Sequence, residues 1–228
     1  MFRVLGGRVT LCEGPAGYRP AEDSLWLATL APKTAGNVCD VGCGTGAVTL
    51  AYGVKNNVRH KGTTLAGFDL NPGMIEAAQA SAAATNLVAD FRTGDVLAPP
   101  FDPGTFDLVL SNPPFYDPHR EQPAQSMAKN STKFTAIPLE EWFTAMVALA
   151  KPGGQLALVC HGADLEKMLA CAPAAGCATL AVYRLKAHPE KQAKRVVLVC
   201  SKNTGNTPAP KHETVLTYDP DTRKHHLE

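Results

Sequence analysis

The residues best suited to chemistry form a rigid polar turn, Asn112-Pro113-Pro114-Phe115, which directly follows the apolar run at 106–110. Two consecutive prolines fix two φ angles and remove two backbone donors, so the turn offers acceptors and few donors. The side-chain carbonyl of Asn112 and the Pro113 carbonyl can accept two hydrogens, and the Phe115 ring can stack on a plane. The turn therefore predicts a site for a planar group that carries an NH2, although Asn-Pro alone more often marks a turn that ends a strand.

A second candidate site is a glycine-rich turn after a short expected strand at 37–41. Its spacing is G-x-G-x-G rather than the G-x-G-x-x-G of dinucleotide-binding folds. Gly42 and Gly44 would let the backbone approach a ligand, and Gly46 would let the next helix pack near the strand. Asp40 places a carboxylate at the strand end, which would repel a pyrophosphate but attract an ammonium group. The turn therefore predicts a nucleoside with a cationic amino-acid arm.

Two further expected strands end in carboxylates. The run at 64–70 contains Asp69, which can accept both hydroxyls of a ribose or, alternatively, only stabilise the start of the next helix. The run at 89–93 is followed by Asp95, whose carboxylate could hold an adenine amine. Because the carboxyl ends of parallel strands meet at one edge of an open sheet, where ligands bind, we expect both carboxylates to lie beside the first two sites.

The other periodic segments predict an α/β fold. Helices are expected at 21–31, 72–83, 138–150 and 164–172, with Asp164 as the cap of the last, and further strands at 9–11, 155–160, 179–186 and 195–200. The last two strands should form an antiparallel pair. Asp23 lies in the first turn of the first helix, where compensation of the helix dipole is the simplest interpretation. In the glycine- and proline-rich loop before it, Tyr18 and Arg19 face either a ligand or solvent.

Length and composition predict one domain. The chain has 228 residues and a net charge of +1, which suits a single domain over 1–226 with an N-terminal extension at about 1–35. Residues 227–228 resemble a tag remnant. No apolar run approaches the roughly 18 residues of a membrane span, so we expect a soluble intracellular protein. Seven cysteines lie mostly in apolar segments and suit buried thiols, and Cys39 and Cys43 lack the second pair of a metal site.

The turn at 40–46 resembles the cofactor turn of class I S-adenosylmethionine-dependent methyltransferases. This resemblance implies a Rossmann-like sheet of seven strands with helices on both faces and a C-terminal antiparallel hairpin. The turn at 112–115 resembles the amino-methyltransferase signature, in which Asn and the first Pro carbonyl hold a target NH2. More narrowly, the chain resembles bacterial methyltransferases of an adenine amine in valine tRNA through Gly6-Gly7-Arg8, Gly17-Tyr18-Arg19, Asp23 and Lys194-Arg195-Val196.

The resemblance implies the roles of individual residues. Catalysis would fall to Asn112, Pro113, Pro114 and Phe115, without a metal. S-adenosylmethionine would be bound by Tyr18, Asp23, Asp40, Gly42, Cys43, Gly44, Gly46, Asp69, Leu70, Asp95, Val96 and Asn112. RNA, most simply tRNA, would be bound by Arg19, Tyr116, Arg120, Lys129, Lys133, Lys194 and Arg195. A cytoplasmic monomer or weak homodimer is expected.

Three alternatives remain open. Phe115 stands where the tRNA subfamily usually has Tyr, and Phe is also common there in enzymes that methylate a guanine amine in ribosomal RNA. Similar signatures serve enzymes that methylate a glutamine amide in release factors. A cofactor-fold module that binds RNA or a partner without turnover is the third. Basic residues in the loop at 117–136 and in the final hairpin favour RNA, since cations on both sides of the catalytic turn would attract phosphates. In the hairpin they are Arg184, Lys186, Lys191, Lys194, Arg195 and Lys202.

Overall fold

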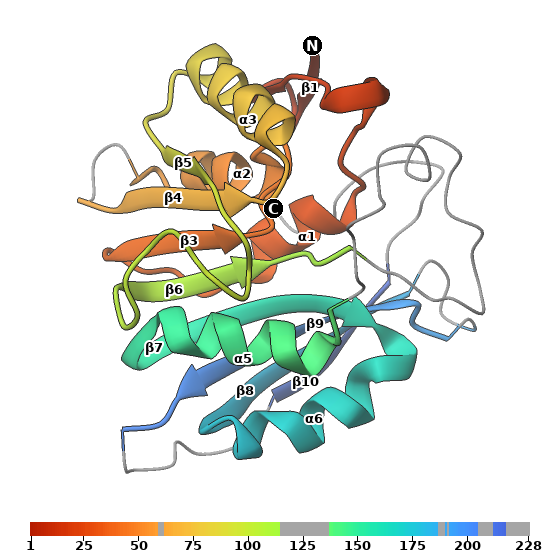
Figure 1. Cartoon of the computed structure of the whole chain (residues 1–228). Coiled ribbons are helices and arrows are strands. Elements are labelled where there is room, and N and C mark those ends of the chain that lie inside the picture. Colours follow the sequence, from red (N-terminus) through yellow and green to blue (C-terminus); the bar gives the residue numbers. More distant parts are fainter. Residues whose placement is uncertain (59–61, 115–136, 187–189, 191, 205–211, 218–228) are drawn as a thin grey trace.

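The computed structural model describes residues 1–58, 62–114, 137–186, 190, 192–204 and 212–217. Its centre is an eight-stranded sheet in the order β10-β8-β9-β7-β6-β3-β4-β5, with helices on both faces (Figure 1). The strands are β3 (Asn37–Val41), β4 (Thr64–Asp69), β5 (Asp90–Thr93), β6 (Phe106–Ser111), β7 (Ala150–His161), β8 (Cys177–Lys186), β9 (Arg195–Lys202) and β10 (His212–Thr217). Neighbours from β7 to β5 are parallel, whereas β9 runs antiparallel to β7 and β8. The expected α/β fold and antiparallel hairpin are thus confirmed.

The helices divide between the two faces of the sheet. They are α1 (Asp23–Leu30), α2 (Ala47–Lys55), α3 (Pro72–Thr85), α5 (Leu139–Leu149) and α6 (Leu165–Ala174). Leu27 of α1 and Leu50 of α2 belong to one buried apolar cluster, and Phe143 of α5 and Met168 of α6 belong to the other. Both clusters rest on the central strands, so the sheet is covered on its two faces.

The two-sided cover explains the sequence of the central strands. In β3, Val38 packs in the cluster of α1 and α2, while the next residue, Cys39, packs in the cluster of α5 and α6, and both are fully buried. A strand that is buried on both faces reads as a continuous apolar run rather than an alternating one. The polar residues of such strands therefore collect at their ends.

The N-terminal segment packs against the helical layer of the first face. Strands β1 (Phe2–Val4) and β2 (Val9–Leu11) form a two-stranded antiparallel sheet. The Thr10 and Cys12 amides donate to the hydroxyls of Thr85 (3.1 Å) and Ser81 (2.8 Å) in α3. Val9 and Leu11 are fully buried in the same core as α1 and α2.

The structure differs from the expected elements in three places. Strand β10 adds an eighth strand, parallel to β8, where seven were expected. Strand β7 begins at Ala150 rather than at 155, because Ala150 pairs with Phe106 and the residues at 151–154 are accommodated as an irregularity before Gln155 pairs with Leu108. Asp164 precedes α6 but makes no side-chain cap hydrogen bond. The sequence predicted a helix up to 150 and a strand only from 155, because the proline and two glycines between them normally interrupt a strand.

Candidate active site

Four adjacent parallel strands bring the candidate residues to one edge of the sheet. In the strand order β6-β3-β4-β5, Val41 pairs with both Ser111 and Phe68, and Asp69 pairs with Thr93, so the carboxyl ends are level. Asn112, the glycine turn, Asp69 and Asp95 therefore follow one another along this edge, as the sequence predicted. Asp40 lies one residue inside the strand end.

The glycine turn adopts backbone angles that favour glycine. Gly42, Gly44 and Gly46 have φ of 68°, 53° and 82°, in the left-handed region. A Cβ on Gly46 would lie 3.0 Å from the Phe91 ring, and one on Gly42 would lie 2.8 Å from the ring of Trp142. The close approach at Gly42 is therefore to an indole ring of α5, a contact that the sequence did not indicate.

Asp69 joins the glycine turn to the start of α3. Its Oδ2 accepts a hydrogen bond from the Gly44 amide (3.0 Å), and its Oδ1 accepts one from the Asn71 amide (2.9 Å). The Asn71 side chain in turn caps α3 by accepting from the Gly73 amide (2.9 Å). Burial raises the pKa of Asp69, and the two backbone donors oppose that rise. Each carboxylate oxygen keeps an acceptor site, so Asp69 remains suited to two ribose hydroxyls.

Asp40 lies beneath the turn and is 1% exposed. Its Oδ2 accepts from the Thr49 amide (3.2 Å) and the Thr49 hydroxyl (2.8 Å), which joins β3 to α2. Its Oδ1 is buried without a hydrogen-bond partner among the described residues. Burial raises the pKa of Asp40 from 3.8 to about 7. The unpartnered oxygen is the atom left to accept from an ammonium group, and such a donor would lower this pKa.

The raised pKa of Asp40 predicts a pH-dependent stability. Between pH 4 and pH 7 the folded state holds a proton on Asp40 that the unfolded state has released, so the contribution of Asp40 to stability falls as pH rises through this window. Asp40→Asn keeps an acceptor for Thr49 but carries no charge. We expect the melting temperature of this variant, relative to wild type, to increase from pH 5 to pH 8. Thermal unfolding of both proteins without cofactor checks this; a constant difference across the range would contradict it.

The Asn112 side chain is held at one end only. Its Nδ2 donates to the Ser24 hydroxyl (3.2 Å), while its Oδ1 is buried without a partner in the described part of the chain. The preceding residue, Ser111, donates to the Val41 carbonyl (2.7 Å) and accepts from the indole nitrogen of Trp142 (2.9 Å). Pro113 is buried and Pro114 is exposed. The turn thus presents a fixed, unsatisfied acceptor.

The loop before α1 lies over the glycine turn. The Tyr18 side chain is 42% exposed, and its ring lies 3.8 Å from the position of a Cβ built on Gly44. Partial burial, and then the carboxylates of Asp69 and Asp40, raise the pKa of Tyr18. Arg19, which was expected to contact RNA, forms an ion pair with Glu13 and stacks on the Phe2 ring at 4.8 Å.

The remaining cofactor candidates have mixed environments. Leu70 is 46% exposed, whereas Cys43 and Val96 are each 5% exposed. The Asp95 carboxylate accepts from the Leu97 amide (2.9 Å). Phe115, Tyr116, Arg120, Lys129 and Lys133 lie outside the described residues, as does Lys191.

Intramolecular contacts occupy several cations of the expected basic hairpin. Arg195 pairs with Asp23 at 2.9 Å, and Arg184 pairs with Glu213. The Lys202 ammonium donates to the carbonyls of Val147 and Ala150, at 2.8 Å each. Asp23, which was interpreted most simply as compensating the dipole of α1, thus also pairs with Arg195 of β9. Lys194 is exposed at the start of β9, on the same sheet edge as Asn112.

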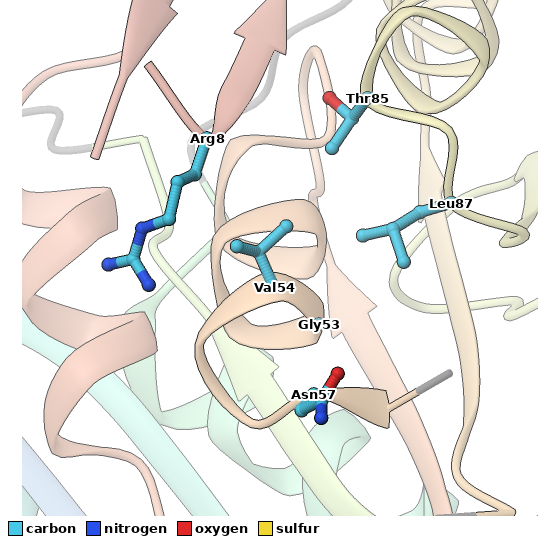
Figure 2. A pocket seen from close by; sticks show the side chains of 6 residues that line it. All are labelled: Arg8, Gly53, Val54, Asn57, Thr85 and Leu87. Carbon is cyan, nitrogen blue, oxygen red and sulfur yellow. The ribbon is translucent and has the colours of Figure 1, made fainter. Parts of the chain in front are cut away.

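A cavity of about 260 Å³ lies at the opposite edge of the sheet. It is lined by the end of α2, the end of α3 and the segments next to them, through Arg8, Gly53, Val54, Asn57, Thr85 and Leu87 (Figure 2). Because α2 runs from the glycine turn towards the start of β4, this cavity is separate from the candidate site. Across the described ranges, no cluster of His, Cys, Asp and Glu is placed to hold a metal ion, and no helix is both long and apolar enough to cross a membrane.

Comparisons of the sequence and of the structure with known proteins both match methyltransferases. A family model described as methyltransferase small domain matches residues 22–163. Over 94 residues the chain is 36% identical to the ribosomal RNA small subunit methyltransferase C proteins of Escherichia coli and Escherichia fergusonii. This match covers 41% of the chain and 25% of each relative, so the chain spans about a quarter of their length.

Solved structures share the fold at low identity. A predicted O-methyltransferase from Agrobacterium tumefaciens superposes with a TM-score of 0.65 and 17% identity, covering 88% of this chain and 89% of that protein. A Listeria monocytogenes protein provisionally assigned to the class I S-adenosylmethionine-dependent methyltransferases superposes with a TM-score of 0.64 and 17% identity. The match covers 88% of this chain and 65% of that protein. At 17% identity these matches show a shared fold alone.

Proposed function

We propose that this chain, which belongs to the methyltransferase small domain family, methylates an exocyclic amine of a base in RNA. Membership of this family implies a methyltransferase, and S-adenosylmethionine as the methyl donor is part of the proposal. The observation that carries the choice of acceptor is the buried, unpartnered Oδ1 of Asn112 at the carboxyl edge of β6. An amine hydrogen is the complement that such an acceptor lacks.

The residues of the site fit the cofactor. The Asp69 carboxylate is suited to the ribose hydroxyls, the open face of Gly44 beneath Tyr18 to the nucleoside, and the Oδ1 of Asp40 to the ammonium group. The cofactor, when bound, supplies an electrophilic methyl group on a sulfonium. These assignments, together with those of Asp95, Leu70 and the other cofactor candidates named above, are part of the proposal.

The chain's own contribution to the reaction is positioning. The lone pair of an aryl amine is delocalised into the ring, which makes the nitrogen a poor nucleophile. Acceptors at Asn112 Oδ1 and the Pro113 carbonyl would hold the two hydrogens, favour a pyramidal nitrogen and direct its lone pair. No strong base is required, because the product ammonium loses its proton readily. The target base must unstack from the RNA to enter the site. Phe115, the residue after Pro114, would then stack on it.

Two bases are candidates within this function. The short motifs Gly6-Gly7-Arg8, Gly17-Tyr18-Arg19 and Lys194-Arg195-Val196 resemble those of enzymes that methylate an adenine amine in tRNA. A guanine amine in ribosomal RNA is favoured by Phe115 at the fourth signature position and by the names of the relatives. A cytoplasmic monomer or weak homodimer with a single domain completes the proposal.

The acceptor class can be tested by offering both kinds of acceptor together. Incubation of the protein with labelled S-adenosylmethionine, total RNA and cell protein from a strain that lacks the gene should place label in the RNA fraction. Label in the protein fraction alone would favour the glutamine-amide alternative. Cofactor binding without label in either fraction would favour a binding module.

The exposed Lys194 provides a test of the RNA surface. Each neutralised phosphate of a single strand contributes about 0.7 to the slope of log affinity against log salt. We expect Lys194→Ala to lower this slope by about that amount. Removal of Arg195 should change the slope less, because Arg195 is already paired with Asp23. RNA-binding titrations across salt concentration measure both variants.

Lys33→Ala is the matched control, because Lys33 is also exposed but lies before β3, at the opposite sheet edge. Its slope should equal that of wild type. Identical slopes for Lys194→Ala and wild type would remove Lys194 from the RNA surface.

A further inference from the structure

The proposed acceptor, Asn112, depends on a residue far away in the sequence. Its side chain has one described hydrogen bond, from Nδ2 to the hydroxyl of Ser24, which lies 88 positions earlier. Ser24 is the second residue of α1 and is 5% exposed. The contact therefore joins the first helix of the domain to the end of β6.

In this structure the contact leaves the acceptor end of the amide unpartnered. An Asn side chain has a donor end and an acceptor end, and a half-turn about its last bond exchanges them. With Nδ2 committed to Ser24, Oδ1 is the end left without a partner. A target amine needs an acceptor there, whereas an exposed Nδ2 would repel its hydrogens.

Ser24 is itself held firmly. The neighbouring Asp23 pairs with Arg195 at the start of β9, with both side chains less than one-third exposed. Trp26 and Leu27, two and three residues further along α1, are buried in the core. The hydroxyl thus stands on a rigid support that is anchored to the sheet on one side and to the core on the other.

We propose that Ser24 is a positioning residue of the transfer reaction, whose hydroxyl holds the Asn112 side chain in place through Nδ2 and so leaves Oδ1 available for the target amine. The inference rests on the proposed function. It differs from an ordinary structural role in one respect: Ser24 should matter for transfer only while Asn112 is present.

A double-mutant cycle tests this dependence. Single-turnover transfer to RNA, at saturating cofactor, is measured for wild type, Ser24→Ala, Asn112→Ala and the double variant. We expect Ser24→Ala to slow transfer about 10-fold, as for loss of alignment at a reacting group. The double variant should be no slower than Asn112→Ala, within about two-fold. Cofactor affinity should be the same in wild type and Ser24→Ala.

Ser81→Ala is the matched control. Ser81 is also a buried helical serine with hydrogen bonds to the backbone, but it lies in α3 and contacts Cys12 and Ala77. Its loss should lower the melting temperature and leave the transfer rate unchanged. A rate loss in Ser81→Ala as large as in Ser24→Ala would assign both effects to general destabilisation.

The remaining outcomes separate the two proposals. Equal rate losses from Ser24→Ala with and without Asn112, or no loss in either background, would overturn the role of Ser24. The proposed function would survive either result provided that Asn112→Ala remains strongly impaired. If Asn112→Ala itself transfers methyl groups like wild type, the proposed function fails at its acceptor.

Discussion

Replacement of Asn112 by Ala is expected to lower single-turnover methyl transfer to RNA by about 100-fold or more, while the affinity for S-adenosylmethionine stays nearly unchanged. The reason is the position of Oδ1, which is buried at the end of β6 without a partner in the described residues. Because Oδ1 is already desolvated and fixed, it loses little hydration and little freedom when the amine binds. Its removal should therefore raise the free energy of the transition state.

Asn112→Asp is the informative control for this change. It keeps an acceptor oxygen but loses the Nδ2 that donates to Ser24. We expect it to retain more transfer activity than the Ala variant. Transfer by Asn112→Ala within a few-fold of wild type would remove Asn112 from the reaction.

Replacement of Asp69 by Ala is expected to weaken the binding of S-adenosylmethionine by about 1.5 to 3 kcal/mol, the usual loss for hydrogen bonds to a charged group. This is roughly a 10- to 150-fold increase in Kd. The structure adds a second reason, because Asp69 also accepts from the Gly44 amide and so holds the glycine turn in place. Titration calorimetry measures the change.

Two variants make the Asp69 result specific. Asp69→Asn keeps one acceptor oxygen and should lose less affinity than Asp69→Ala. Asp90→Ala removes a carboxylate at the start of β5, three residues before the carboxyl end of that strand, and should bind like wild type. Unchanged affinity in Asp69→Ala would exclude Asp69 from the cofactor site.

The sheet edge was predictable because its signals are local. Each central strand is a short apolar run followed by a polar residue, so the positions of Asp69, Asp95 and Asn112 could be read from the sequence. Parallel pairing then places them together without any knowledge of long-range contacts. The position of the glycine turn after β3 is equally local, since it follows from the glycine spacing.

The contacts that refine the site were not predictable because they join distant segments. Ser24 and Asn112 are 88 positions apart, and the partners of the Arg195–Asp23 ion pair are 172 apart. Trp142 reaches Ser111 from a helix of the other face. The number of cations in the hairpin predicted a basic surface beside the site. The number alone could not show which of these cations already pair with carboxylates of other elements.

One edge strand of the large sheet, β10, was missed for a related reason. Strand β10 is half exposed, with Glu213 and Val215 both in solvent, so its sequence carries neither a continuous apolar run nor a clean alternation. Its pairing with β8 depends on the exposed edge of that strand, which only the assembled sheet defines.

The position of the transferred methyl group tests the central claim most directly. RNA from cells that lack the gene is incubated with the protein and S-adenosylmethionine carrying an isotopically heavy methyl, then digested to nucleosides and analysed by mass spectrometry. We predict that the heavy methyl lies on the exocyclic nitrogen of adenine, or of guanine, and that it is nearly absent when Asn112→Ala is used. A heavy methyl on a ribose oxygen, a ring nitrogen or a ring carbon, or no methylated nucleoside at all, would contradict the proposed function.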